Sequence, residues 1–158
     1  MKQATLGFLI KRDENGKISE ILLAMKKRGF GKGRINGTGG KVVSGEKIKD
    51  CVIRETQEEI AVTMIQPKKF GLIKFRFKYN ENFNQDVHFY MCERWEGEPA
   101  ESEEMKPRWY KIENIPYQKM WPDDKFWMPL FLRDKKITGK ILFGENDLIL
   151  ENSIKSTD

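Results

Sequence analysis

The chain has 158 residues, of which 39% are hydrophobic, and this is enough to build one ordinary domain around a single core. Its 29 basic and 24 acidic side chains leave a formal charge of +5, which favours anionic partners only weakly. The apolar runs are too short and too interrupted by charges to cross a bilayer, and the N-terminus has no apolar signal core. We therefore expect one cytoplasmic domain over residues 1–158, without a membrane partner.

Two cysteines and one histidine limit the metal chemistry. Cys51, Cys92 and His88 show no paired spacing, so they predict neither a disulfide framework nor a zinc site. A reducing compartment fits this cysteine usage. Any metal must then be held by oxygen ligands.

The first part of the chain predicts a hairpin followed by a long, shaped loop. Residues 5–11 and 20–25 are apolar runs of strand length, and the Asn15-Gly16 pair between them favours a tight reversal. Residues 26–45 contain too many glycines for a stable regular element. These glycines are Gly29, Gly31, Gly33, Gly37, Gly39, Gly40 and Gly45.

The middle of the chain predicts a helix and then three strands. Residues 47–60 contain no glycine or proline, and their apolar side chains recur with helical spacing. Residues 70–79 and 86–95 have the pattern of strands, and residues 108–112 add a shorter one.

The last part of the chain predicts a second helix and a hairpin. Pro122 is expected to start the helix, which runs to Phe131 and is made less regular by Pro129. Residues 140–143 and 148–151 form the hairpin. The expected fold class is α/β (α+β), with a mixed β-sheet sandwiched between α-helices.

The helix at residues 47–60 carries the most informative pattern, because its core-facing stripe turns from apolar to acidic. Like charges on one helix face repel, and a partly buried, unpaired carboxylate costs several kcal/mol. Arg54 can neutralise only one of the three acids, so a divalent cation is expected to balance the remaining negative charge. Because the ligands are carboxylate oxygens, we expect this cation to be Mg²⁺, with Mn²⁺ as a substitute. The alternative is a solvated acidic face balanced by Lys27, Lys47 and Lys49. The stripe consists of Ile48, Cys51, Val52, Glu55, Glu58 and Glu59.

This segment resembles the signature box of the Nudix hydrolases in its leading glycine and in every charged position. Two positions depart from the family pattern. Thr56 replaces a large apolar residue, which predicts looser helix packing, and Ala61 replaces a glycine, which predicts a helix end without a left-handed glycine cap. Neither change removes a metal ligand. The matching residues are Gly40, Glu46, Arg54, Glu55, Glu58 and Glu59.

The resemblance implies a magnesium-dependent hydrolase with the Nudix fold. Glu55, Glu58 and Glu59 would be the catalytic acids, and together with a backbone carbonyl of the Gly39-Gly40 loop they would hold Mg²⁺ against the phosphate chain. Which acid is the general base varies in the family, so Glu55 and Glu58 are only candidates. Glu104 resembles the additional metal-binding carboxylate that relatives bring from a loop; without the family it would be one more exposed acid.

A basic cluster precedes the proposed metal loop. Lys26, Lys27 and Arg28 stand beside Gly29 and Gly31, a combination that suits phosphate contact through charge and backbone amides. The alternative is a solvated basic surface. The phosphate interpretation is favoured because the cluster leads directly into the glycine-rich segment.

The segment from Trp121 to Asp124 is the best candidate for binding a base. Proline and aspartate are also what a helix N-terminus prefers, so capping explains much of the pattern. However, a tryptophan offers a stacking surface, and two adjacent carboxyls can read a purine edge if one is protonated and donates. Asn36 supplies a further donor and acceptor.

Over nearly its whole length the chain looks like the mammalian MutT-homologue enzymes, which hydrolyse oxidised purine nucleoside triphosphates. The similarity implies that Trp121 stacks on the base. Departures at Ile35, where those enzymes carry tryptophan, and Gln85, near a position they fill with methionine, affect the pocket shape. The implied substrate-binding residues are Thr5, Lys26, Phe30, Asn36, Thr38, Gly39, Gly40, Lys41, Phe75, Met105, Trp121, Pro122, Asp123 and Asp124.

The expected reaction is therefore the cleavage of an oxidised purine nucleoside triphosphate, such as 8-oxo-dGTP or 2-oxo-dATP, to the monophosphate and pyrophosphate. One alternative is a general Nudix pyrophosphatase acting on dinucleoside polyphosphates or capped RNA. Another is a nucleotide-binding module without catalysis. We expect a monomer that binds a small nucleotide and has no stable nucleic-acid partner, since the sequence shows no basic platform interleaved with aromatic residues.

Overall fold

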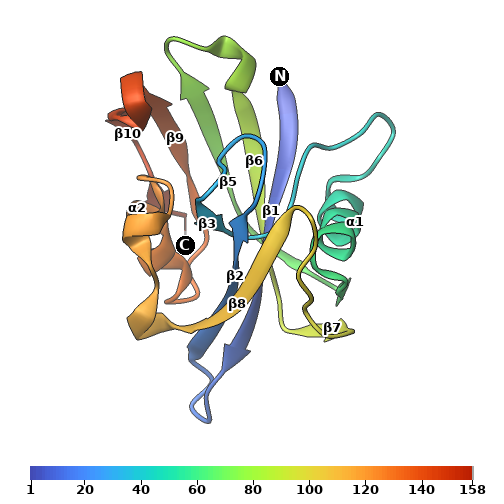
Figure 1. Ribbon diagram of the computed structural model, residues 1–158. Coiled ribbons are helices and arrows are strands. Elements are labelled where there is room, and N and C mark those ends of the chain that lie inside the picture. The colour runs from blue at the N-terminus through green and yellow to red at the C-terminus, as the bar shows by residue number, and fades with distance from the viewer. Residues whose placement is uncertain (158) are drawn as a thin grey trace.

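The structure is a computed structural model that describes residues 1–157, and its centre is a large mixed β-sheet (Figure 1). The strands of this sheet are β1 (Lys2–Arg12), β2 (Ile18–Lys26), β3 (Ile35–Asn36), β5 (Lys68–Phe77), β6 (Gln85–Cys92), β8 (Met105–Lys111), β9 (Ile137–Phe143), β10 (Ile149–Asn152) and β11 (Lys155–Ser156).

The strand order of the sheet is β10-β9-β5-β6-β1-β2-β3, with β8 also paired to β2 and β11 to β9. The β1–β6 and β5–β9 pairs are parallel, and the other pairs are antiparallel. A separate small sheet joins β4 (Thr63–Ile65) to β7 (Arg94–Glu96). The short 3₁₀ helices are Glu81–Phe83, Ile112–Asn114, Tyr117–Lys119 and Glu145–Asp147.

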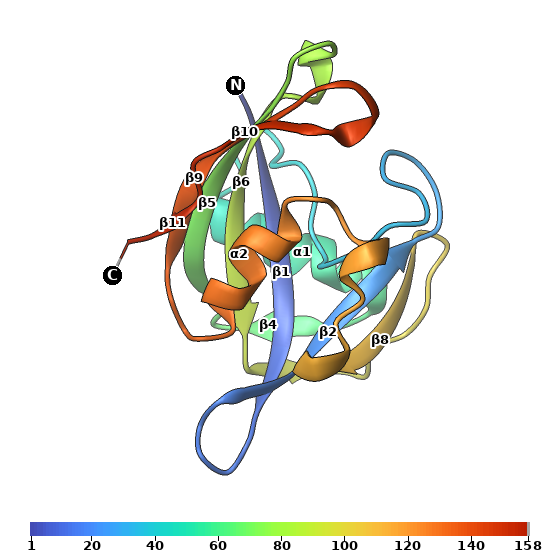
Figure 2. The same ribbon diagram turned by 90° about the vertical axis from the view of Figure 1, so that its left-hand side faces the viewer.

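The helices α1 (Ile48–Ile60) and α2 (Asp124–Phe131) cover opposite faces of the large sheet (Figure 2). The strand alternation explains this arrangement, because successive side chains of a strand point to opposite faces. Phe8 belongs to the apolar core on the α2 side, whereas its neighbour Leu9 belongs to the core on the α1 side. The expected sandwich of a mixed sheet between helices is confirmed.

The helix α1 lies where the sequence predicts it. Its C-terminus has a left-handed residue, which the replacement of glycine by alanine did not lead us to expect. Ala61 itself takes the left-handed conformation, with φ 61°, and its N–H donates to the Gln57 carbonyl. Thr56, where the sequence predicts looser packing, is fully buried. Its hydroxyl lies 2.7 Å from that of Thr38, so the polar atom gains a hydrogen bond in place of apolar contact.

The helix α2 begins two residues later than predicted. Pro122 lies outside it, Asp123 is the residue before its first turn, and Pro129 is accommodated inside it. The Asp123 side chain makes no capping hydrogen bond. The capping interpretation holds only in part: Asp123 and Asp124 do lie at the N-terminus of the helix, but Pro122 precedes it and Asp123 makes no capping hydrogen bond.

Two strand predictions need correction. The segment expected to be a loop at residues 26–45 contains the short strand β3 and forms bridges to β1 at Thr38 and Lys41. The strand expected over residues 86–95 is divided: β6 ends at Cys92, and β7 belongs to the small sheet. Backbone pairing, which hydrophobic periodicity does not report, decides both cases.

Within residues 1–157, no helix has the length and apolar character needed to span a membrane.

Ile21 tests the α2-side core. It is completely buried in β2, whereas Leu148 is 65% exposed. We expect Ile21→Ala to lower the free energy of unfolding by about 2–5 kcal/mol, because it removes buried apolar surface and leaves a cavity. Leu148→Ala should change it by less than about 0.5 kcal/mol. Urea denaturation of both variants checks this, and similar losses in the two variants would contradict the assignment of the core.

Candidate active site

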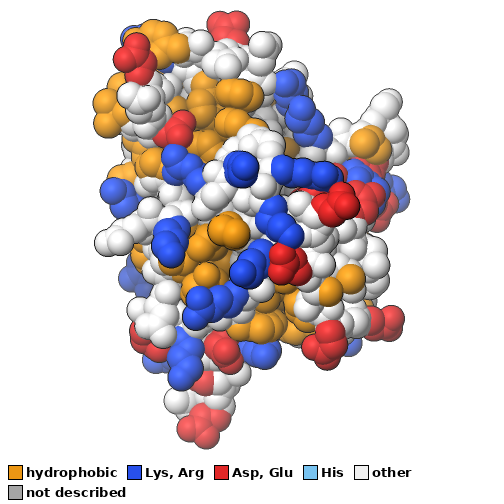
Figure 3. All heavy atoms as spheres, in the orientation of Figure 1, with side chains coloured by type: hydrophobic (Ala, Val, Ile, Leu, Met, Phe, Trp, Pro, Cys, Tyr) orange, Lys and Arg blue, Asp and Glu red, His pale blue; other side chains and the backbone are white. Residues whose placement is uncertain are grey.

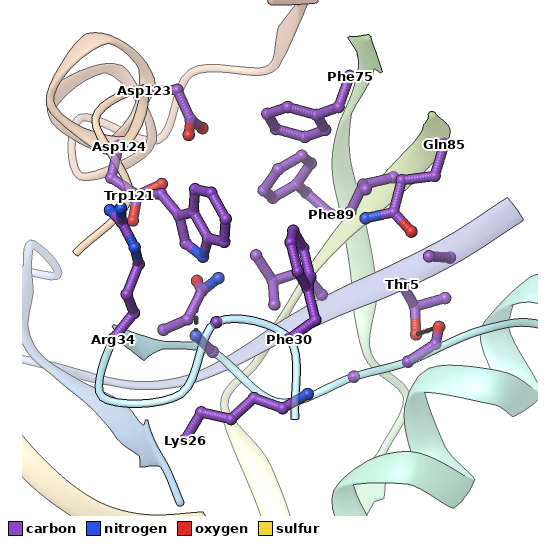
Figure 4. Close-up of a pocket in the computed structure, with 18 of the residues that line it drawn as sticks. Thr5, Lys26, Phe30, Arg34, Phe75, Gln85, Phe89, Trp121, Asp123 and Asp124 are labelled. Atoms are coloured by element: carbon purple, nitrogen blue, oxygen red, sulfur yellow. Dashed lines mark hydrogen bonds between the residues drawn. The ribbon is translucent and has the colours of Figure 1, made fainter. Parts of the chain in front are cut away.

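A cavity of ≈ 270 Å³ opens between the sheet and the loops around it (Figure 4). Its walls come from β1, β5 and β6, from the loop after β2 and from the segment before α2. Most of the substrate-binding residues expected from the sequence line this cavity. They are Thr5, Lys26, Phe30, Asn36, Gly39, Gly40, Lys41, Phe75, Met105, Trp121, Asp123 and Asp124.

Thr38 and Pro122 do not line the cavity. Thr38 is buried under α1, where its hydroxyl bonds to that of Thr56 and its backbone exchanges two hydrogen bonds with Gly7. Its role is to attach the glycine-rich loop to β1. Pro122 lies between two residues that do line the cavity, so it positions them rather than contacting the space itself.

Several lining residues were missed by the sequence reasoning. Phe77 follows Phe75 by two positions on β5, and strand alternation alone predicts that both face the same side. Arg34 gave no such signal, because it lies in a loop whose path depends on tertiary contacts. Gln85, which the sequence associated with the pocket shape, also lines the cavity. The missed residues are Ala4, Leu6, Ala24, Gly31, Arg34, Gly37, Phe77, Val87, Phe89 and Phe143.

Trp121 stands at the centre of an aromatic wall. Its ring centroid lies 5.2 Å from that of Phe30 and 5.8 Å from that of Phe143. The Arg34 guanidinium lies 4.3 Å from the ring and is itself held by the Met120 carbonyl and by Asp147. These contacts fix the plane of the indole, so its orientation is already set before a ligand binds.

Phe30 is held at the mouth of the cavity by a second aromatic contact. Its ring stacks on Phe83 with centroids 4.3 Å apart, although both residues are more than one third exposed. Phe83 belongs to the loop between β5 and β6, so the two loops meet over the cavity. This contact reduces the freedom of the glycine-flanked Phe30.

Asp123 and Asp124 form a buried carboxyl pair, and each is only 2% exposed. The indole N–H of Trp127 donates to one oxygen of each, at 3.1 Å in both cases. Burial raises the pKa of both carboxyls, and the neighbouring charge of Asp123 raises that of Asp124 further. The second oxygen of Asp124 has no hydrogen-bond partner within residues 1–157. Such a group is suited to bonding a ligand.

The acidic end of α1 is organised by Arg54. Its guanidinium bonds to Glu46 at 2.7 Å and to Glu55 at 2.9 Å, and it reaches Glu58 at 3.3 Å. Arg54 lowers the pKa of Glu46 to about 2. Glu58 is at the edge of the helix, with 57% of its side chain exposed, and so lies farther from the core than the helical stripe predicts.

Glu59 and Glu55 sit deeper than Glu58. Glu59 is nearly fully buried, and burial raises its pKa to about 8, although its carboxylate accepts the Gly39 N–H at 2.9 Å. Burial also raises the pKa of Glu55. A Cβ at Gly40 would lie 2.6 Å from the Glu55 carboxyl carbon, so a larger residue there would displace the Glu55 carboxylate from its position against the loop.

In residues 1–157, no three acidic, His or Cys side chains are already arranged as a metal cluster. Each expected ligand has another partner in this structure. Glu55 and Glu58 form ion pairs with Arg54, and Glu59 accepts a hydrogen bond from the Gly39 N–H. Glu104 lies 3.3 Å from the Arg28 guanidinium. The donor set nevertheless fits a hard divalent cation, since it offers oxygen atoms alone and its buried acids have raised pKa values. A bound cation would remove their desolvation cost.

The basic cluster is only partly directed at the cavity. Lys26 lines it, but Lys27 bonds to Glu101 at 2.6 Å and Arg28 pairs with Glu103 and Glu104. Figure 3 shows Lys and Arg side chains across the middle of this face and acidic ones beside α1. The phosphate interpretation therefore rests on Lys26 and Lys41 in the cavity wall, while Lys27 and Arg28 connect two loops.

A mixed sheet lies between two helices, and the acidic helix lies beside the cavity. Comparison with known protein families identifies the class of protein that has this arrangement. The model of the NUDIX domain matches residues 1–131 of the chain. The protein therefore belongs to the Nudix family.

The relatives make this placement more specific. A protein named oxidized purine nucleoside triphosphate hydrolase from Danio rerio is 45% identical over 138 residues, which cover 87% of this chain and 88% of the relative. The protein of the same name from Mus musculus is 44% identical with the same coverage. A solved structure of a MutT protein from Bacillus halodurans has a TM-score of 0.83 and covers 98% of both chains. At 23% identity, this last likeness shows the fold alone.

The Asp123–Asp124 pair predicts a pH-dependent stability. Unfolded aspartate titrates at about pH 4, whereas both folded pKa values are raised, so the contribution of the pair is fully present below about pH 4 and is lost as the pH rises through the folded values. We expect Asp124→Asn to be more stable than the parent protein at pH 8, by about 1–3 kcal/mol. The difference should shrink toward pH 4. Urea denaturation across pH 4–8 checks this, and parallel profiles would contradict it.

Proposed function

We propose that the protein hydrolyses oxidised purine nucleoside triphosphates, such as 8-oxo-dGTP and 2-oxo-dATP, to the monophosphate and pyrophosphate. The observation that carries the proposal is the buried Asp123–Asp124 pair in a cavity that also reaches the glycine loop beside the acidic helix. Such a cavity can hold a base at one end and phosphates at the other. The names of the relatives from Danio rerio and Mus musculus support the same substrate class.

The aspartate pair would recognise the base by hydrogen bonding. Burial raises both pKa values, and the charge of Asp123 raises that of Asp124 further, so the pair favours one shared proton, with Asp124 as donor and Asp123 as acceptor. Exchange of the proton between them would allow more than one oxidised base to bind. Asn36 adds a donor and an acceptor, and its amide is oriented by the Gly37 N–H at 2.8 Å.

The aromatic wall would hold the plane of the base. Trp121, fixed by Arg34 and Phe143, supplies the stacking surface, and Phe30 lies across the mouth of the cavity. Phe75 and Met105 complete the apolar lining. A fixed indole lowers the entropy lost on binding, because its orientation does not change.

The acids of α1 would hold the metal, which we propose to be Mg²⁺ with Mn²⁺ as a substitute. Glu55, Glu58 and Glu59 supply carboxylates, Glu104 adds another from its loop, and the Gly39-Gly40 segment supplies a carbonyl. When bound, the ion neutralises phosphate charge and lowers the pKa of a coordinated water. Glu55 and Glu58 are our candidates for the base that takes the proton of the attacking water.

Basic side chains would position the phosphates. Lys26 and Lys41 line the same cavity as the glycine loop and bring positive charge to it. Thr5 lies at the inner side, where its N–H donates to the Gly40 carbonyl and fixes the loop. We further propose that residues 1–158 act as one monomeric domain in a reducing cytoplasm, without a nucleic-acid partner.

Initial rates of pyrophosphate release test the substrate assignment. With Mg²⁺ and limiting substrate, we expect kcat/KM for 8-oxo-dGTP or 2-oxo-dATP to exceed that for dGTP and dATP by about 10- to 100-fold, since a few hydrogen bonds of about 1–3 kcal/mol each carry the discrimination. Asp123→Asn should change the order of preference among these four substrates.

The control for this experiment is Glu58→Gln, which should lower all four rates by about 100-fold or more because it removes a proposed ligand and base candidate. Equal rates for oxidised and undamaged purines would refute the oxidised-purine assignment. If none of the four is cleaved, dinucleoside polyphosphates and capped RNA become the substrates to test.

Thermal unfolding tests the metal site independently of catalysis. Mg²⁺ at about 100 times its Kd should stabilise the protein by about 2.7 kcal/mol, because it binds the native state. Glu59→Gln should reduce this shift, since it removes a ligand that is buried and bonded to Gly39. An unchanged Mg²⁺ shift in the variant would count against Glu59 as a ligand.

A further inference from the structure

Gln85 is a polar side chain in an otherwise apolar part of the cavity wall. It begins β6, where it is paired with Lys2 of β1 and Phe75 of β5. Strand alternation places Gln85, Val87 and Phe89 on the same face, and all three line the cavity. Figure 4 shows Gln85 on the same side as Thr5, across the cavity from Trp121 and the aspartates.

The Gln85 amide has unused hydrogen-bonding capacity. Its backbone carbonyl accepts from Arg76, but neither its side-chain oxygen nor its side-chain nitrogen has a hydrogen-bond partner within residues 1–157. The side chain is half-buried. A ligand filling the cavity would displace water from the amide, and the loss of its hydrogen bonds to water costs free energy unless the ligand replaces them.

The sheet register shows which part of a nucleotide reaches Gln85. Trp127 donates to both aspartates and its ring lies 4.8 Å from that of Phe89, so the base end of the cavity is at the level of Phe89. At about 3.3 Å per residue, Gln85 lies about 13 Å farther along the strand.

The phosphate end lies across β1 from Gln85. Lys41 forms a bridge with Ala4, and Ala4 is in register with Val87 of β6. A nucleotide whose base is beside Phe89 and whose phosphates are beside Lys41 would place its sugar between these two levels, close to Val87. Gln85 is the next residue outward on this face.

We propose that the Gln85 amide hydrogen-bonds the 2′-hydroxyl of the bound nucleotide and so helps the protein accept ribonucleoside as well as deoxyribonucleoside triphosphates. The amide provides both a donor and an acceptor, as a hydroxyl partner requires. This inference deepens the proposed function and rests on it for the direction in which the nucleotide lies.

Binding measurements in the Glu58→Gln protein separate sugar recognition from catalysis. Isothermal titration with Mg²⁺ compares 8-oxo-GTP with 8-oxo-dGTP, and GTP with dGTP, in Glu58→Gln and in Glu58→Gln/Gln85→Met. Methionine keeps the length of the side chain but removes the amide. We expect the preference for the ribonucleotide in each pair to fall by about 3- to 10-fold in the double variant, the effect of losing one hydrogen bond.

The matched control is Gln118→Met in the same background, because Gln118 is exposed and outside the cavity. It should leave both ratios unchanged. If the affinities for the ribo and deoxy forms change equally, or if neither changes in the double variant, the proposed sugar contact is overturned. Gln85 would then only line the cavity. Equal affinity for oxidised and undamaged bases would instead count against the proposed function. The ratio of ribonucleotide to deoxyribonucleotide affinity would still test Gln85 in that case. If the parent protein also neither binds nor hydrolyses any of the four nucleotides, both proposals are overturned.

Discussion

The close contact between the glycine loop and β1 is the constraint on which the site depends. A Cβ at Gly37 would lie 2.5 Å from the Gly7 carbonyl oxygen, and one at Gly39 would collide with the Thr5 carbonyl. Hydrogen bonds from Thr5 to Gly40 and between Gly7 and Thr38 hold the loop in this position. Because Gly40 also touches Glu55, the loop joins the sheet to the acidic end of α1. The cavity and the proposed metal ligands are thus connected through one loop.

The site concentrates negative charge that the protein alone balances incompletely. Arg54 pairs with Glu46, Glu55 and Glu58. Burial raises the pKa of Glu59, and the hydrogen bond from the Gly39 N–H offsets this only in part. At the other end of the cavity, the aspartate pair has one shared indole donor. Burying these acids costs stability in the free protein, and binding of the proposed cation and base would offset this cost. Such local conflicts are expected where a structure serves binding rather than folding.

The sequence predicted the helices and strands that depend on the spacing of nearby residues. It did not predict the elements that depend on contacts between residues distant in the chain. Period-two and helical spacing located the hairpin, α1 and the sheet. The strand β3 and the bridges of the glycine loop depend on pairing with partners distant in sequence, so periodicity did not report them. Asp123 has the local pattern of a helix cap, yet its carboxylate turns inward to Trp127 because the indole N–H needs an acceptor when buried. Arg28 pairs with an acidic loop that no local pattern connects to it.

The alternation of β1 explains why a single strand contributes to both halves of the site. Ala4 and Leu6 face the α2 side and line the cavity beside the aromatic residues, whereas Thr5 and Gly7 support the glycine loop and α1. A slip of one residue in the register of β1 would exchange these two sets. The parallel pairing of β1 with β6 opposes such a slip, since it would also move Leu6 away from Phe89. The relative position of the base end and the acid end is therefore fixed by the backbone of the sheet and not by the loops that carry most of the polar side chains.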